Sequence, residues 1–204
     1  MKHLTNEEIY GRVQAVIRNE AAALEFLADY AKQEQIAEIV NLLANHEGHI
    51  YTCACGTSGI TARKIAHSMS CIEKSTTYIA PSDAVHGGLG RLQEGDIMIF
   101  ISKGAQSTEL EPVLRACKAK KVICITTTEN PEGTLAKGSD YVVPMNVHME
   151  ADPFKLLATS STLAAMSIWD AIVITLLEMT EYTKERFGVI HPGGAVGVQL
   201  LSGK

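Results

Sequence analysis

From residue 49 onward, short apolar runs alternate with segments of helical spacing, and this alternation restricts the possible folds more than any other feature of the chain. The runs cover 49–55, 76–80, 96–101, 121–126 and 140–145. Helical patterns cover about 59–70, 107–119 and 131–138, with a turn around 82–90 and further helices over about 160–180 and 183–188. Such alternation predicts right-handed crossovers and a mostly parallel sheet covered on both faces. We therefore expect a doubly wound α/β domain.

The first 46 residues predict two helices instead of strands. Thr5 followed by Glu8 forms a capping box that opens the first helix. Because no glycine-rich linker follows, we expect 1–46 to be a helical arm of the same domain, packed on it or on a second subunit, and 47–204 to form the main part. Apolar residues recur at helical spacing at Ile9, Val13, Val16, Ile17, Leu24 and Leu27, and again at Ile36, Ile39, Val40 and Leu43.

Charge and hydropathy exclude several classes of partner. A net charge of −5 and a pI near 5.8 argue against nucleic acid and against an anionic membrane surface. The apolar stretch from Leu163 to Leu177 is interrupted by Asp170 and is predicted to be too short to span a bilayer. The N-terminal residues contain no signal-peptide core, so we expect a cytoplasmic protein.

The five cysteines show neither Cys-x-x-Cys nor a Cys/His spacing typical of a metal site. Cys53 and Cys55 alternate on the first predicted strand, and we expect both to pack as small apolar side chains. A metal site built from His86, His148 and His191 lacks supporting spacing. We therefore expect neither a metal nor a cofactor.

Two loops at the ends of predicted strands are rich in glycine and hydroxyl groups. The first contains Gly56, Thr57, Ser58 and Gly59, and helix-start amides beside it would attract a phosphate. It matches neither the dinucleotide fingerprint nor a P-loop, and an ordinary helix cap would look similar. The second loop, 102–108, repeats the same chemistry. Because ligands bind beyond the carboxyl ends of parallel strands, the two loops together favour one anion site.

Two titratable residues lie further along the chain. Glu150 follows the last predicted strand and is the candidate for a proton-transfer base, although a solvated loop glutamate would have the same sequence. His191 precedes Pro192 and a glycine-rich turn, where the preceding helix is expected to stop. Its unperturbed pKa near neutral pH suits it to moving protons. One of the hydroxyls among 159–161 is expected to cap the long helix.

Taken together, these segments resemble the sugar isomerase (SIS) domain family, and especially its arabinose-5-phosphate isomerase branch. The similarity covers nearly the whole chain, and the motifs around Thr159 and His191 are specific. The matching segments are Gly56–Gly59, His86–Gly90, Ser102–Ser107, Glu150–Pro153, Thr159–Thr162 and His191–Gly197.

The resemblance implies a five-stranded parallel sheet, a phosphosugar ligand, and a homodimer or homotetramer in which His191 reaches a neighbouring subunit's site. It also implies Glu150 as the base for the carbon-bound proton, and His191 for ring opening or oxygen protonation. The residues that it implies for binding are Gly56, Thr57, Ser58, His86, Ser102, Lys103, Gln106, Ser107, Thr159 and Ser160.

Some positions depart from the branch. Thr57 stands where a lysine is usual, and Gly104 and Gln106 replace a serine and a glutamate. Lys103 could supply the missing positive charge, or its side chain could point to solvent. The first loop is similar instead to the isomerase domain of glucosamine-6-phosphate synthase, whose threonine and serine contact the phosphosugar. We also expect a chain without the paired regulatory CBS modules common in the branch.

Three functions are compared. The first is an aldose–ketose isomerase that acts through an enediol on a pentose or hexose phosphate. The second is a non-catalytic phosphosugar-binding module that acts as a sensor. The third, a dinucleotide-dependent oxidoreductase, requires a glycine fingerprint that the first loop lacks. The presence of both Glu150 and His191 favours the isomerase, because a binder has no evident need for a paired base and acid.

Overall fold

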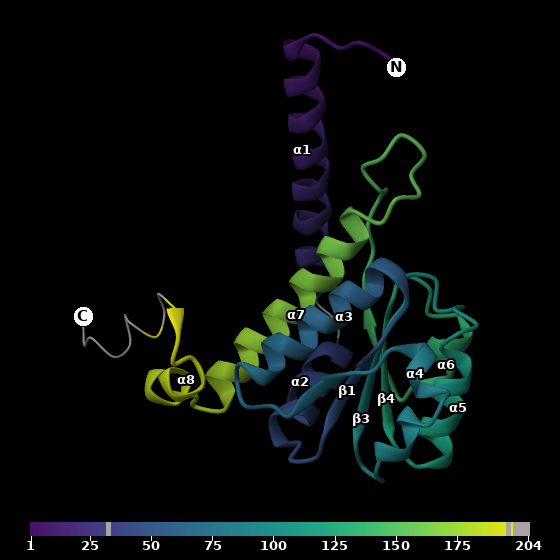
Figure 1. Cartoon of the computed structure of the whole chain (residues 1–204), viewed down its shortest axis with the longest axis vertical. Coiled ribbons are helices and arrows are strands. Elements are labelled where there is room, and N and C mark those ends of the chain that lie inside the picture. Colours follow the sequence, from purple (N-terminus) through teal and green to yellow (C-terminus); the bar gives the residue numbers. More distant parts are fainter. Residues whose placement is uncertain (32–33, 195–196, 198–204) are drawn as a thin grey trace.

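The computed structural model describes residues 1–31, 34–194 and 197, and its centre is a parallel sheet (Figure 1). The strand order is β2-β1-β3-β4-β5, with every neighbouring pair parallel. The strands are β1 (Ile50–Cys53), β2 (Thr76–Tyr78), β3 (Ile97–Ile101), β4 (Ile123–Thr128) and β5 (Tyr141–Pro144). The predicted doubly wound α/β fold is therefore confirmed.

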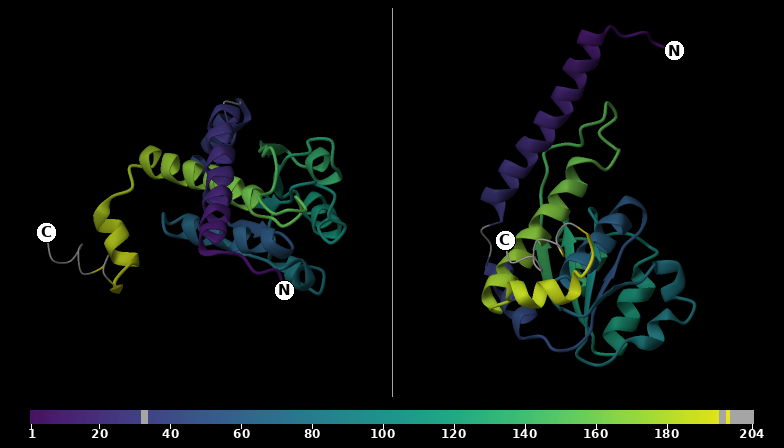
Figure 2. Two further views of the ribbon diagram at one scale, coloured as in Figure 1. Left: turned by 90° about the horizontal axis from the view of Figure 1, so that it is seen from above. Right: turned by 60° about the vertical axis from the view of Figure 1, so that its left-hand side comes forward.

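Helices cover both faces of the sheet, as Figures 1 and 2 show. On one face lie α1 (Asn6–Tyr30), α2 (Glu34–Asn45), α3 (Gly56–Ser70) and α7 (Ser160–Met179). On the other lie α4 (Pro81–Ala84), α5 (Glu111–Ala119) and α6 (Thr134–Gly138), with the short 3-10 turn η1 (Gly88–Arg91) after α4. The helix α8 (Lys184–Ile190) follows the C-terminal end of α7 and lies beyond it, to the left of the domain in Figure 1.

The central strand β3 shows why the sequence forms two cores. All five of its residues are buried, with Ile97, Ile99 and Ile101 in the core under α7 and the residues between them in the core under α5. This two-residue period is what a strand buried on both faces requires. The fully buried Trp169 of α7 joins the layers, because its indole Nε1 donates a hydrogen bond to Thr127 Oγ1 of β4 at 2.9 Å.

The helix α7 corrects one expectation from the sequence. It has 20 residues and is long and apolar enough to cross a membrane by length and composition, so the apolar stretch is not too short. Half of its most apolar window is buried inside the domain, where the helix packs against α1, α2 and α3. Such burial is typical of the core helix of a globular α/β domain.

The helix α1 has two different halves. The capping box of Thr5 and Glu8 is present, as predicted. In the second half Ala23 and Leu27 are buried against the core that contains α7. The first half projects away from the sheet (Figure 2). Its apolar face is exposed at Ile9, Tyr10, Val13, Val16 and Ile17.

Several element boundaries differ from the sequence prediction, and three of them bear on the loops at the carboxyl edge of the sheet. The helix α3 begins at Gly56, three residues early, and Gly56 itself has a φ of +56°, a conformation that glycine adopts without strain. The helix α5 begins at Glu111 instead of 107, with Pro112 in its first turn. The strand β4 lies two residues later than predicted. These shifts lengthen the loop after β3 and extend β4 to Thr128.

Candidate functional site

The two hydroxyl-rich loops lie side by side, because β1 and β3 are hydrogen-bonded neighbours at the point where the strand order reverses. Gly56, Thr57 and Ser58 form the first turn of α3, with Thr57 exposed and Ser58 half-buried. Their backbone N–H groups are among those that a helix leaves without internal partners. The first loop is therefore a helix N-terminus whose hydroxyls stand beside its free amides.

The loop after β3 is held in shape by its neighbours. Ser102 is buried, and its Oγ lies 3.0 Å from Ser107 Oγ, so the two hydroxyls share a hydrogen bond across the loop. Ala105 has a φ of +49° and its carbonyl accepts from Leu135 N at 3.0 Å. Gln106 is exposed. The structure thus brings Ser102 and Ser107 together and leaves the Gln106 side chain in solvent.

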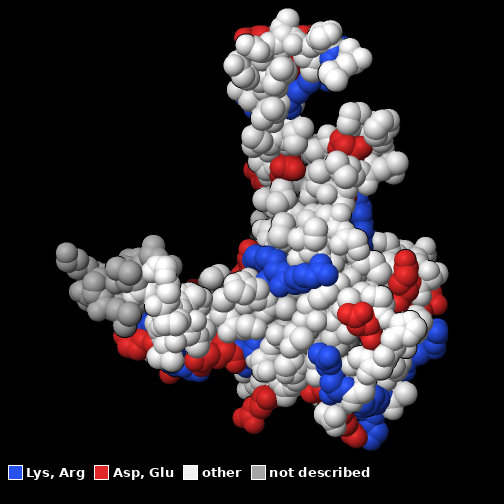
Figure 3. All heavy atoms as spheres, viewed as in Figure 1, with Lys and Arg blue, Asp and Glu red and all other residues white. Residues whose placement is uncertain are grey.

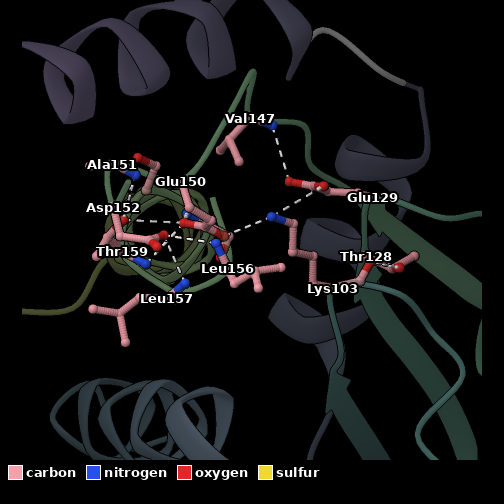
Figure 4. Close-up of polar contacts among 12 residues, drawn as sticks. Lys103, Thr128, Glu129, Val147, Glu150, Ala151, Asp152, Leu156, Leu157 and Thr159 are labelled. Atoms are coloured by element: carbon pink, nitrogen blue, oxygen red, sulfur yellow. Dashed lines mark hydrogen bonds and ion pairs between the residues drawn. The ribbon is translucent and has the colours of Figure 1, made fainter. Parts of the chain in front are cut away.

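Glu150 is buried at the start of α7, with only 3% of the residue exposed. Its Oε2 accepts hydrogen bonds from Thr159 N at 2.9 Å, Ser161 N at 3.2 Å and Thr159 Oγ1 at 3.3 Å (Figure 4). A carboxylate at a helix N-terminus is favoured by the partial positive charge there. The prediction of a solvated loop glutamate is therefore excluded.

The same contacts correct the predicted cap of α7. No hydroxyl among 159–161 caps the helix: Thr159 is its N-cap residue without a side-chain cap bond. The Thr159 hydroxyl accepts instead from Ala151 N at 3.0 Å, and Ser160 is fully buried with its Oγ donating to Asn19 Oδ1 of α1 at 3.0 Å. The carboxylate of Glu150 takes the capping role. Thr159 and Ser160 as phosphate ligands remain predictions.

Lys103 points into the site. Its Nζ lies 2.7 Å from Glu150 Oε1 and 3.8 Å from Glu129 Oε2, so the ammonium stands between two carboxylates (Figure 4). Glu129 directly follows β4, and its Oε1 accepts from Val147 N at 3.1 Å. Glu129 is not among the residues predicted from the sequence for this site. The sequence signal that could have identified Glu129 is its position directly after β4, the strand next to β3.

The contacts set opposite pKa shifts on the two carboxylates. Burial on its own would raise the pKa of Glu150, but hydrogen bonds from Lys103, Ser161 and Thr159 outweigh burial and lower the pKa to about 2. Burial raises the pKa of Glu129, and the nearby Lys103 and the Val147 amide only partly offset it. Glu150 is therefore held firmly as an anion.

His86, Cys53 and Cys55 lie outside this network of hydrogen bonds and ion pairs. His86 is exposed in the turn after α4, and its backbone N donates to Asp83 O at 3.2 Å. Cys53 is fully buried, whereas Cys55 is only half-buried and lines a cavity of about 510 Å³ beside the first loop. The expectation that both cysteines pack as small apolar side chains is confirmed, because Cys53 lies in the core under α5 and Cys55 packs against the same core. Around this cavity lie also Arg63, Tyr78, Pro81, Val85, Glu109 and Pro112.

His191 lies far from Glu150 within one chain. It ends α8, where its ring stacks on Phe187 with 3.8 Å between ring centroids and its Nδ1 lies 3.0 Å from Phe187 O. Glu150 meets the first turn of α7, whereas α8 follows the last (Figure 1). A helix of 20 residues is roughly 30 Å long. Of the motif after His191, Ala195 and Val196 lie outside the described residues.

Charges are mixed over the visible face of the molecule. Figure 3 shows Lys and Arg side chains interspersed with Asp and Glu over the α/β domain. Among the described residues there is no group of three or more His, Cys, Asp or Glu side chains arranged to hold a metal ion.

A family model called SIS domain matches residues 42–175, which contain the whole sheet and nearly all of α7. The chain belongs to the SIS domain family. The curated SIS relatives include the arabinose 5-phosphate isomerases KpsF of Escherichia coli, 30% identical over 93% of this chain, and KdsD of Salmonella typhi, 32% identical over 98%. The chain spans 58% and 62% of the lengths of these two relatives.

Solved structures of SIS proteins superpose closely on this chain. A Listeria monocytogenes protein, provisionally named as a sugar-phosphate isomerase, has a TM-score of 0.92 and 41% identity, and the match covers 94% of this chain and all of that one. An Escherichia coli CFT073 protein, solved in complex with arabinose 5-phosphate, has a TM-score of 0.89 and 27% identity, with 93% of this chain and all of that one covered.

Proposed function

We propose that the chain is an aldose–ketose isomerase of a sugar phosphate, with arabinose 5-phosphate as the first substrate to test. The observation that carries the proposal is the buried Glu150 carboxylate at the carboxyl edge of the sheet. Its Oε2 is fixed by the amides of α7, and the hydrogen-bond partner of its Oε1 among the described residues is the Lys103 ammonium. The relatives KpsF and KdsD, whose names state this activity, support the proposal.

In this reaction Glu150 moves one proton from C2 to C1 of the sugar in two steps. Its carboxylate takes the proton from C2 of the open-chain aldose, the electron pair of that bond forms a C1=C2 double bond, and the C1 oxygen takes up a proton to give an enediol. The C2 hydroxyl then loses its proton as the C2 carbonyl forms, and Glu150 returns its proton to C1. A base positioned in this way contributes about 10²–10⁴-fold to the rate.

The phosphate is proposed to bind between the two hydroxyl-rich loops. Ser102 and Ser107 already face each other there, and Ser58 stands in the first turn of α3. Backbone amides at a helix N-terminus and neutral hydroxyls can hold a dianion without a dedicated cation. The exposed Thr57 and Gln106 can reach the sugar or the phosphate from the rim of the site.

His191 is proposed to act in the site of a neighbouring subunit. Within one chain Glu150 meets the first turn of α7, a helix roughly 30 Å long, whereas His191 ends the helix that follows its last turn, so we infer that the oxygen-bound protons of one site are served by a histidine from a second copy. We therefore propose a homodimer or homotetramer, working in the cytoplasm. The exposed apolar face on the first half of α1 supplies a surface that such an assembly would cover.

The test follows the C2 proton. Incubation with arabinose 5-phosphate in deuterated water, followed by proton NMR, should show formation of the 2-ketose and loss of the C2 proton signal. Glu150→Gln should lower the rate by about 10²–10⁴-fold, and Glu132→Gln, at an exposed glutamate paired with Lys137, is the matched control.

The second candidate function is a phosphosugar-binding module without turnover. The observation in its favour is the ion pair itself, because an ammonium 2.7 Å from Glu150 Oε1 makes the carboxylate a weak base. A phosphosugar that raises the melting temperature but neither forms product nor exchanges its C2 proton would establish this function and overturn the isomerase.

A further inference from the structure

Lys103 is held between two carboxylates that come from different parts of the chain. Its ammonium lies 2.7 Å from Glu150 Oε1 and 3.8 Å from Glu129 Oε2. The Lys103 side chain is 41% exposed, whereas Glu129 is 20% and Glu150 3% exposed. The cation is therefore the most exposed member of the group, and each of the two carboxylates is also held by backbone N–H groups.

Glu129 is fixed so that one oxygen faces the lysine. Its Oε1 accepts from Val147 N at 3.1 Å, which leaves Oε2 toward Lys103 (Figure 4). The backbone of Lys103 is tied to the same strand end, since its carbonyl accepts from Glu129 N at 3.0 Å and from Thr128 Oγ1 at 2.8 Å. With both backbones anchored, only the flexible lysine stem has to move for the ammonium to change its partner.

Proton abstraction at carbon requires such a movement. As long as the ammonium occupies Glu150 Oε1, that oxygen is both blocked and weakened as a base. Moving the ammonium away without a second anion would leave that cation unpaired, whereas Glu150 keeps the hydrogen bonds from the α7 amides to its other oxygen. Glu129 offers the replacement within 4 Å.

We propose that Glu129 is a positioning residue, which takes over the ammonium of Lys103 when a phosphosugar binds and so frees Glu150 Oε1 to receive the C2 proton. This inference rests on the proposed isomerase function. Lys103 keeps its three protons throughout, and the only bonds that change are those of the sugar and the O–H bond formed and broken at Glu150. Burial raises the pKa of Glu129, so a closer ammonium stabilises its anion more than the present distance does.

The first test is Glu129→Gln, which keeps an oxygen for the Val147 amide but removes the charge. We expect kcat for arabinose 5-phosphate to fall roughly 10- to 100-fold while KM changes by less than about twofold. Glu129→Asp should restore part of kcat. Glu132→Gln, three residues along the same loop, is the matched control and should leave both constants unchanged.

A double variant shows whether Glu129 acts through the lysine. In a Lys103→Gln background, adding Glu129→Gln should produce no further loss of kcat, because there is no ammonium left to transfer. A kcat of Glu129→Gln close to that of the wild type, or a full additional loss in the Lys103→Gln background, would overturn the inference while leaving the isomerase function intact.

A carboxyl NMR titration separates this inference from the function on which it rests. Binding of arabinose 5-phosphate should raise the pKa of Glu150 in the wild type but not in Glu129→Gln. An unchanged Glu150 titration in the liganded wild type overturns the partner exchange, whether or not the protein turns over. Absence of C2 exchange in the wild type, with Glu150 titrating as expected, overturns the isomerase function alone.

Discussion

At the residue scale, Glu150 combines two demands that conflict. A base works best when its pKa lies near the working pH, yet Lys103, Ser161 and Thr159 lower the pKa of Glu150 to about 2. Enzymes resolve such a conflict by changing the surroundings of the base when the substrate binds. In this site the lysine is the member whose contact can be exchanged, because the α7 amides that hold the other carboxylate oxygen belong to the helix backbone.

The lowered pKa of Glu150 predicts how stability depends on pH. Because the folded pKa lies below the unfolded one, the stabilisation is complete above about pH 5 and is lost as the pH falls toward 2. Glu150→Gln should lower the free energy of unfolding by about 2–3 kcal/mol at pH 7, and the two proteins should converge in acid. Urea unfolding between pH 7 and 3 measures this, with Glu132→Gln as control; parallel curves at all pH values would contradict it.

At the element scale, the sequence predicted the order of strands and helices because apolar periodicity is local. Buried runs such as Ile97–Ile101 carry the pattern within five residues. Contacts between elements were harder to predict. The side chain of Lys103 could point to solvent or into the site, and the sequence does not show that residues 103, 129 and 150 converge, because three loops with separate turns bring them together.

The residue that caps α7 was also predicted wrongly, because the cap comes from a part of the chain that is not adjacent to the helix. Hydroxyl residues at 159–161 are the usual local caps, but a glutamate nine residues before Thr159 folds back and occupies the helix N-terminus. Likewise, the helical spacing of Ile9, Val13 and Ile17 predicted a helix correctly, but did not show that its apolar face stays open in one chain.

The contact between the loop after β3 and the start of α6 predicts a sensitive glycine. A Cβ at Gly133 would lie 2.5 Å from Ala105 Cβ and 2.8 Å from Gly104 O, too close for either backbone to accommodate without moving. Gly133→Ala should cost roughly 1–3 kcal/mol of stability and raise KM for the phosphosugar by displacing the loop.

Gly104, on the other side of the same contact, is the control for that stability change. A Cβ at Gly104 would meet nothing within 4 Å, so Gly104→Ala should leave the free energy of unfolding unchanged. Chemical denaturation of both variants compares them directly. Equal free energies of unfolding for Gly133→Ala and the wild type would contradict the prediction and show that the loop can move aside without a loss of stability.

At the scale of the whole molecule, the two proposed catalytic residues are separated by the length of α7. Glu150 caps one end, and His191 follows the helix that succeeds the other. Mixing Glu150→Gln with His191→Asn subunits should therefore restore activity that neither has alone, to about a quarter of wild type for a randomly mixed symmetric dimer. Mass spectrometry of the mixture verifies subunit exchange. If exchange is complete and no activity returns, the histidine serves its own chain.

The open face of α1 predicts where the copies meet. Val13→Asp together with Ile17→Asp places charges on exposed apolar positions, so the fold of one chain should be unaffected while the assembly loses mass. Light scattering during size-exclusion chromatography measures this, and Gln14→Asp on the same exposed half-helix is the control. An assembly of unchanged mass would show that α1 is not the interface.

The cap formed by Glu150 has a consequence for reading related sequences. Because the same carboxylate closes the first turn of α7, selection for a folded domain alone is enough to keep a glutamate at this position, even in a descendant that has lost its chemistry. His191, whose described contacts are confined to its own short helix, has no comparable structural reason to persist. On the proposed function, a relative that keeps the glutamate but lacks the histidine is therefore expected to bind the phosphosugar without isomerising it.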